Sequence, residues 1–148
     1  MVEARGRWIA LFDNDQLAEK DWLKNLLAVA LQIGADCIAG TRLLDLPIEQ
    51  PSPLGPICRR LLGESIYHEA PAIYRGKEGP GIGNLLIALG IFDSFGPFDT
   101  SMLWNVEDSD TLLRARAAGS NIWIAPDAVV RHVVPSTLHN QLFGSKAG

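Results

Sequence analysis

The sequence lacks the features that mark several specialised classes of protein. It contains no uninterrupted apolar run of about 18 residues, the length needed to span a membrane, and its first residues, MVEARGRW, lack the apolar core of a signal peptide. Basic residues are outnumbered, with 13 Lys and Arg against 17 Asp and Glu, so nothing suggests a nucleic-acid partner. We therefore expect a cytoplasmic protein with no transmembrane segment, either free or attached peripherally to a membrane.

Cysteine is also scarce. Cys37 and Cys58 form no CxxC motif, and no paired histidine spacing accompanies them, so two reduced, buried thiols are expected. What is present is an ordinary globular composition, with 47% hydrophobic and 20% charged residues in a chain of 148. That material is sufficient for one α/β or other globular domain with a sizeable core, and residues 1–148 are treated as a single domain.

The first 40 residues have the pattern of a strand–helix–strand unit. Trp8 to Phe12 is a continuous apolar run, which predicts a strand buried on both faces of a parallel sheet. A helical repeat of apolar residues follows and should end at Gly34, and residues 37–40 form a second short apolar run. The residues of that repeat are Leu23, Leu26, Leu27, Ala30 and Leu31.

The remainder alternates between loops and short regular elements. Four prolines between Leu46 and Pro56 exclude a helix or a central strand there. A helix is expected from Asn105 to a stop at Gly119, with Val106, Leu113 and Ala117 on its inner face and Arg114 and Arg116 facing outward. Other expected elements are a short helix at 57–62, an apolar segment at 85–89, and extended runs at 122–125 and 128–134.

Two acidic groups stand out. Asp13 and Asp15 directly follow the first strand. Residues i and i+2 of a strand point to the same face, so both carboxylates could contact one Mg²⁺ or Mn²⁺ ion that bridges to a diphosphate. A polar turn without any ligand is the alternative. Glu107, Asp108 and Asp110 cluster at a helix start, where they either stabilise the helix dipole or provide a general base.

A glycine-rich segment is the third feature. Four glycines fall within residues 76–83, but neither the GxGxxG spacing nor a following Lys-Ser/Thr is present. A phosphate cradle is conceivable there, although a mobile loop is the favoured interpretation.

In their order along the chain, these motifs resemble a known family. The chain carries a hydrophobic strand ending in Asp-x-Asp at 13–15, x-x-W-L-x-x-L-L around Trp22, Gly-Asn at 83–84, Gly-Pro-Phe-Asp at 96–99, Glu-Asp-x-Asp at 107–110, Arg114, Ala-Gly at 118–119 and Pro-x-Ala-x-Val-x-His at 126–132. No single motif is specific, but the ordered set, from Trp8 to His132, resembles the family 2 nucleotide-sugar glycosyltransferases, which have the GT-A fold.

The resemblance implies a role for each matched residue. Asp13 and Asp15 would hold Mg²⁺ or Mn²⁺ on the sugar nucleotide, with Asp15 as the direct ligand and Asp13 as a second ligand or a contact to the ribose. His132 would approach the metal or the diphosphate. Asp108 would be the catalytic base that deprotonates the acceptor hydroxyl, with inversion at the anomeric carbon. The remaining residues carried over as substrate contacts are Glu107, Asp110 and Arg114. The implied partners are a nucleotide-sugar donor and a sugar or lipid-linked acceptor.

The chain also departs from the family pattern. Asp-x-Asp arrives at residue 13, so only the C-terminal metal and acceptor half matches, and the N-terminal nucleotide-binding half of the mixed, helix-flanked GT-A sheet has no counterpart. The expected fold class is therefore a partial, Rossmann-like α/β GT-A fold. The Trp8–Phe12 strand would then lack neighbours, and its open apolar edge favours a homo-oligomer. One hypothesis is that the isolated chain is inactive.

Two further functions compete with sugar transfer. Phosphohydrolases of the haloacid-dehalogenase type also place Asp-x-Asp after a strand, but they require Thr or Val where Leu17 stands. A catalytically inactive half-domain that serves as a binding or assembly module is the other alternative, because a fold does not imply an activity.

Overall fold

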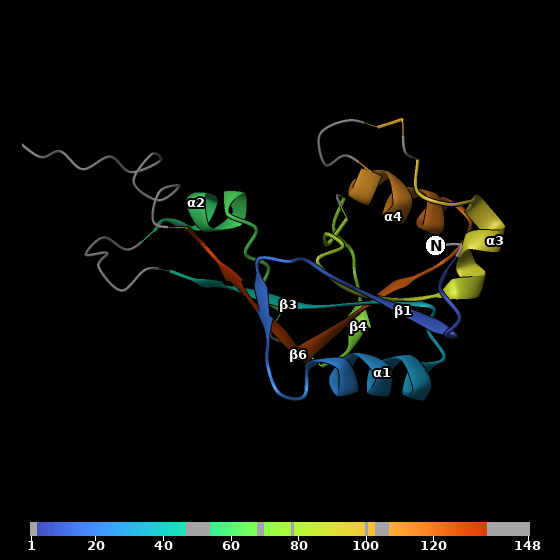
Figure 1. The fold of residues 1–148 in the computed structure, drawn as a ribbon, viewed down its shortest axis with the longest axis horizontal. Coiled ribbons are helices and arrows are strands. Elements are labelled where there is room, and N and C mark those ends of the chain that lie inside the picture. Colours follow the sequence, from blue (N-terminus) through green and yellow to red (C-terminus); the bar gives the residue numbers. More distant parts are fainter. Residues whose placement is uncertain are drawn as a thin grey trace, which may run out of the picture.

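The computed structural model describes residues 3–46, 54–67, 70–77, 79–99, 101–102 and 107–135, without the side chains of residues 107 and 108. These residues form one mixed β-sheet with helices on both faces, which confirms the expected α/β class (Figure 1). The strands are β1 (Trp8–Phe12), β2 (Gln16–Ala18), β3 (Cys37–Asp45), β4 (Ala72–Ile73), β5 (Asn84–Ala88) and β6 (Ile122–Val133). The helices are α1 (Trp22–Ile33), α2 (Pro56–Leu61), α3 (Phe92–Phe95) and α4 (Glu107–Ala117), with a 3₁₀ turn η1 (Leu89–Ile91).

The position of β1 differs from the expectation. The strand exists with the predicted bounds, but it is not a buried member of a parallel sheet. The sheet order is β1-β5-β3-β6-β2, so β1 lies at an edge and pairs antiparallel with β5. All five residues of β5 are buried, and this strand takes the central place between β1 and β3. β1 and β3 still run in the same direction, because each is antiparallel to β5.

Two apolar clusters cover the two faces of the sheet. Leu26 and Ala30 of α1 pack on one face, and Leu112 and Ala115 of α4 pack on the other together with Phe92 (Figure 1). The apolar stripe of α1 is narrower than the sequence suggested. Leu23 and Leu31 are 47% and 61% exposed, since only the residues nearest the sheet are covered.

The inner face of α4 also required correction. Leu113 is 48% exposed, and the residues turned to the sheet are Thr111, Leu112 and Ala115. The predicted inward position of Val106 lies outside the described residues. Both helices end as expected at glycines with positive φ, Gly34 at 70° and Gly119 at 93°. Residues that have a Cβ rarely adopt this left-handed backbone conformation.

The two extended runs near the end of the described chain are a single strand with an irregularity. β6 pairs parallel with β3, and the register shifts between Gly40 and Thr41, so that Ala125 and Val129 face consecutive residues. A side chain at Gly40 would place its Cβ only 2.2 Å from the Ala128 carbonyl oxygen. Glycine is therefore required where the two backbones approach most closely.

Asn84 holds this irregularity together. Its Nδ2 donates to the carbonyl oxygens of Thr41 (2.8 Å) and Ala128 (2.9 Å), and its Oδ1 accepts from Trp22 Nε1 (2.6 Å). One buried side chain thus ties β5 to β3, β6 and α1. No helix among the described residues is long and apolar enough to cross a membrane.

Candidate functional site

The turn that follows β1 carries the Asp-x-Asp motif. The strand ends at Phe12, and Asp13 to Asp15 form a turn into β2, in which the Gln16 N–H donates to the Asp13 carbonyl oxygen (3.3 Å). The alternation of side chains along a strand does not extend to these residues. The two carboxylates instead face different partners, which divides the motif into two halves.

Asp15 faces His132. The carboxylate Oδ2 lies 3.3 Å from His132 Nε2. The pairing of β2 with β6 produces this contact, because Gln16 is opposite His132 and the Val133 N–H donates to the Asp15 carbonyl oxygen (2.9 Å). His132 Nδ1 lies 2.8 Å from the Leu62 carbonyl oxygen. A carbonyl only accepts, so Nδ1 carries a hydrogen. Nε2 therefore faces Asp15 as a lone pair when the ring is neutral and as an N–H when both ring nitrogens carry hydrogen.

Asp13 belongs to a second set of contacts. Its Oδ2 accepts from Gln16 Nε2 (3.1 Å) and lies 3.9 Å from Arg42 Nη1. Gly83 closes over this carboxylate, since a Cβ there would lie 1.9 Å from the same oxygen. Gln16 is buried, and its Oε1 has no hydrogen-bond partner. The Asp13 carboxylate therefore lies near an arginine, and its hydrogen-bond partner Gln16 keeps a buried acceptor oxygen without a partner.

The described side chains supply two candidate metal ligands at one point. Within the described ranges, no three His, Cys, Asp or Glu side chains gather closely enough to hold a metal ion. Asp15 and His132 nevertheless have the chemistry of a ligand pair. A ligating histidine usually donates its other ring N–H to a carbonyl or carboxylate, as Nδ1 of His132 does to Leu62. Mg²⁺ commonly takes one or two protein carboxylates and completes its shell with phosphate oxygens and water.

The acidic start of α4 is described only in part. The side chains of Glu107 and Asp108 lie outside the described residues, although both belong to α4. Asp110 pairs with Arg114, with 2.6 Å between Oδ2 and Nε. Arg114 Nη1 also donates to the carbonyl oxygens of Phe95 (2.8 Å) and Pro97 (3.1 Å). These bonds fasten α4 to α3 and the following turn, while substrate contact by Arg114 stays a prediction.

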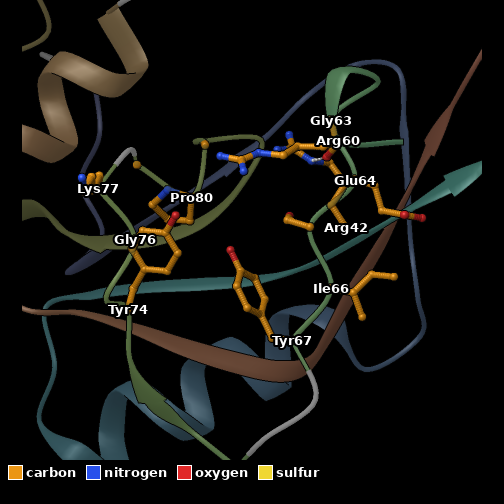
Figure 2. Close-up of a pocket in the computed structure, with 13 residues that line it drawn as sticks. Arg42, Arg60, Gly63, Glu64, Ile66, Tyr67, Tyr74, Gly76, Lys77 and Pro80 are labelled. Atoms are coloured by element: carbon orange, nitrogen blue, oxygen red, sulfur yellow. Dashed lines mark hydrogen bonds between the residues drawn. The ribbon is translucent and has the colours of Figure 1, made fainter. Parts of the chain in front are cut away.

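A cavity of about 710 Å³ has Arg42 and Gly63 among its lining residues (Figure 2). Arg42 Nη1 lies 3.9 Å from Asp13 Oδ2, and a Cβ at Gly63 would lie 3.6 Å from His132 Nδ1, so the cavity adjoins both motif residues. Its walls come from three separate parts of the chain: β3, the end of α2 with the segment that follows it, and the segment between β4 and β5. Arg42, Arg60 and Lys77 contribute positive charge, and Tyr67 and Tyr74 contribute hydroxyl groups. The glycine-rich segment packs on α4, where Arg116 Nη1 donates to the Gly76 carbonyl oxygen (2.8 Å).

Sequence reasoning did not find this cavity. One signal was available in Arg42, a charged residue in the middle of the mostly apolar strand β3, CIAGTRLLD. Charged side chains in such strands are usually paired or functional, because burying an unpaired charge is costly. The glycines of residues 76–83 are compatible with a phosphate cradle, but no spacing rule connects them with Tyr67 or Arg42.

No protein-family model matches the sequence. No curated protein matches it either. Among solved structures, the crystal structure of S. aureus TarS 1–349 in complex with UDP-GlcNAc aligns with a TM-score of 0.50 and 12% sequence identity. The alignment covers 91% of this chain and 37% of the TarS chain. At this identity the match supports a glycosyltransferase-like fold and no more, and the chain spans about a third of the TarS structure.

Proposed function

We propose that this chain forms the metal-binding and acceptor part of an inverting glycosyltransferase that uses a nucleotide-sugar donor. The observation that carries the proposal is the Asp15–His132 pair, with 3.3 Å between Oδ2 and Nε2, on a fold similar to that of TarS, whose crystal structure contains UDP-GlcNAc. The short distance between a carboxylate and an imidazole lone pair is unfavourable unless a proton or a cation lies between or beside them. A divalent ion satisfies both groups at once.

In this proposal Asp15 and His132 hold Mg²⁺ or Mn²⁺. The ion, when bound, would neutralise the charge that develops on the leaving diphosphate. The hydrogen bond from His132 Nδ1 to Leu62 fixes the orientation of the ring and directs Nε2 to the site. Asp15 is 55% exposed at its side chain, so a bound diphosphate can reach the same ion.

Asp13 is proposed to contact the ribose of the donor instead of the metal ion. Its carboxylate is already bonded to Gln16 Nε2 and lies near Arg42, so a position beside the ribose suits it better than direct ligation. The unpaired Gln16 Oε1 provides a buried acceptor for a hydroxyl of the donor. Arg42 adds positive charge on the side of Asp13 that faces the cavity.

The proposed catalytic base is Asp108, in the first turn of α4. The base takes a proton from the acceptor hydroxyl, so its distance from the donor must be held constant. The Asp110–Arg114 pair and the bonds from Arg114 to Phe95 and Pro97 supply that constraint by fixing α4 on α3. Asp110 and Arg114 are therefore proposed as positioning residues, with Glu107 as a neighbour of the base.

The open edge of β1 favours one alternative, a binding or assembly module without activity. Within the described residues β1 pairs only with β5, and its outer edge is free to pair with another chain. A homo-oligomer that forms through this edge would also be compatible with sugar transfer. Light scattering of the purified chain over a dilution series distinguishes a monomer from such an assembly.

Measurements of Mn²⁺ and UDP-GlcNAc binding distinguish the proposed enzyme from a binding or assembly module without activity. Mn²⁺ affinity is measured by isothermal titration calorimetry for the unmodified chain, Asp15→Asn and His132→Gln. Asp21→Asn is the matched control, because Asp21 is 56% exposed and Asp15 is 55% exposed. Loss of either ligand should weaken Mn²⁺ binding at least about tenfold, and the control should change it little. UDP-GlcNAc should bind more tightly with Mn²⁺ than without it.

Two outcomes contradict the proposal. Equal Mn²⁺ affinity in Asp15→Asn and Asp21→Asn would show that the Asp15–His132 pair is not a metal site. UDP-GlcNAc binding that is absent, or indifferent to Mn²⁺, would favour the assembly module. Release of phosphate from an aryl phosphate would instead support the phosphohydrolase alternative.

A further inference from the structure

Two successive backbone carbonyls hold side chains from both halves of the Asp-x-Asp site. The Leu62 carbonyl oxygen lies 2.8 Å from His132 Nδ1. The next carbonyl oxygen, that of Gly63, accepts from Arg42 Nε (2.5 Å; Figure 2). His132 and Arg42 each face one carboxylate of the motif. The two carboxylates thus depend, through different side chains, on neighbouring peptide groups of one short turn.

The backbone at Gly63 lets one turn serve two strands. Gly63 has a φ of 88°, a left-handed conformation that turns the chain directly after α2. A Cβ at this position would lie 3.6 Å from His132 Nδ1 and 3.7 Å from Arg42 Nε. Side chains from the neighbouring strands β6 and β3 therefore close around the same peptide groups.

The segment from Leu62 to Ser65, which we call the 62–65 turn, is fastened at both ends. Leu62 is 6% exposed and packs with Leu44 and Val134. At the other end, the backbones of Ser65 and Arg42 exchange two hydrogen bonds, of 2.8 and 2.9 Å. The turn therefore has a defined place between α2 and β3.

An ion pair closes the turn on α2. Both carboxylate oxygens of Glu64 accept from the guanidinium of Arg59, and the Glu64 N–H donates to the Arg59 carbonyl oxygen (3.0 Å). The Glu64 side chain is only 9% exposed. A two-point contact between a guanidinium and a carboxylate fixes orientation as well as distance. This pair thus restrains the peptide groups that hold His132 and Arg42.

We propose that Arg59 and Glu64 are positioning residues: their ion pair fixes the 62–65 turn, and the turn sets His132 for the metal ion and Arg42 for Asp13. What these two side chains bind rests on the proposed function, but their dependence on one turn does not. Loss of the hydrogen-bond partner of a ligating histidine usually lowers metal affinity about 10–100-fold. Arg59 and Glu64 act through that partner, so a smaller effect of about threefold to tenfold is expected.

The first experiment compares two variants that each remove one negative charge. Calorimetry on Glu64→Gln should find about threefold to tenfold weaker binding of Mn²⁺, and equally of UDP-GlcNAc at saturating Mn²⁺, because one turn serves both halves of the site. Glu19→Gln is the matched control. Glu19 pairs with Arg131, the neighbour of His132 in sequence, with 2.7 Å between Oε1 and Nε. This pair lies outside the turn and is about half exposed, so both affinities should stay within about twofold.

An NMR measurement follows the turn itself. The Nδ1–H proton of His132 gives a resolved signal while its bond to the Leu62 carbonyl protects it from exchange with water. His132→Gln identifies this signal by its loss. The signal should be sharp in the unmodified chain and in Glu19→Gln and broadened in Glu64→Gln, with circular dichroism showing that all three are folded. A general loss of stability without a change at the turn would leave the signal of the folded protein sharp.

A charge-swapped pair separates positioning from direct contact, because Glu64 also lines the cavity. The double variant Arg59→Glu with Glu64→Arg rebuilds the ion pair in the opposite sense. It should recover both affinities and the sharp His132 signal. A folded swapped variant that recovers neither affinity would show that the Glu64 carboxylate itself contacts a ligand, and would overturn the positioning role.

Two other results would overturn the inference: a His132 signal that is equally sharp in Glu64→Gln and Glu19→Gln, or loss of only one of the two affinities in Glu64→Gln. Failure of the proposed function has a different signature. An unmodified chain that binds neither Mn²⁺ nor UDP-GlcNAc contradicts the transferase, while the His132 signal still decides whether the Arg59–Glu64 pair positions the ring.

Discussion

Replacement of Asn84 by alanine should destabilise the protein severely. Asn84 is 4% exposed and makes three hydrogen bonds, to the carbonyl oxygens of Thr41 and Ala128 and from Trp22 Nε1. Alanine would leave all three partner groups without this bond, and the bonds to the two carbonyl oxygens are buried. A buried polar group that loses its partner costs about 1–3 kcal/mol. Because carbonyl oxygens have a second lone pair, we expect a total loss of about 3–5 kcal/mol.

That loss is large on the scale of a whole domain. Proteins of this size unfold with a free energy of about 5–15 kcal/mol. The measurement is urea unfolding followed by tryptophan fluorescence and circular dichroism. Asn25→Ala is the matched control, because Asn25 makes one hydrogen bond at an exposed position, to the Asp127 carbonyl oxygen (2.7 Å). We expect the control to lose less than about 1 kcal/mol.

A second variant separates hydrogen bonding from lost volume. Asn84→Asp keeps the acceptor for Trp22 but turns a carboxylate oxygen toward the Thr41 and Ala128 carbonyl oxygens. It should be at least as unstable as Asn84→Ala at neutral pH and should recover in part in acid, when the carboxyl group regains a hydrogen. The reasoning is refuted if Asn84→Ala loses no more stability than Asn25→Ala, because the β3–β6 irregularity would then not depend on this side chain.

Two further predictions concern the site and the core. Gly83→Ala should push the Asp13 carboxylate aside, since the new Cβ would lie 1.9 Å from Asp13 Oδ2. Calorimetry should then find weaker UDP-GlcNAc binding and an unchanged Mn²⁺ affinity. An equal loss of both affinities would show that Asp13 ligates the ion. Burial, with Asp36 nearby, raises the pKa of Cys37 from 9.0 to about 12, so the neutral thiol stabilises the fold at pH values below about 9 and this contribution is lost as the pH rises toward 12. Cys37→Ala should therefore show a shallower fall in unfolding free energy above about pH 9 than the unmodified chain; parallel curves would contradict the shifted pKa.

Local pattern was enough to identify most of the regular elements. The apolar run of β1, the helical repeat ended by Gly34 and the helix ended by Gly119 all occur where the sequence predicts them. These features depend on neighbours a few residues apart, because side-chain spacing and the conformational freedom of glycine act locally. The inward faces were less predictable. Leu23 and Leu113 satisfy a helical repeat and remain exposed, since burial depends on which surface the helix meets.

The candidate site was accessible to the sequence only in part. Asp13, Asp15 and His132 could be selected as motif residues, but their partners could not. Asp15 meets His132 because β2 pairs with β6 in one register, and Asp13 turns to Arg42 on another strand. Separations of more than a hundred residues, as between Asp15 and His132, leave no periodic trace in a single sequence.

The order of residues along the chain was sufficient to predict the class of fold, the ends of its helices and the residue types available for chemistry. The tertiary structure was needed to place β5 between β1 and β3, to divide the Asp-x-Asp motif between two sets of partners, and to bring three distant segments around one cavity. The physical reason is that secondary structure depends on short-range geometry, whereas strand order and cavities depend on how all apolar surfaces are buried together.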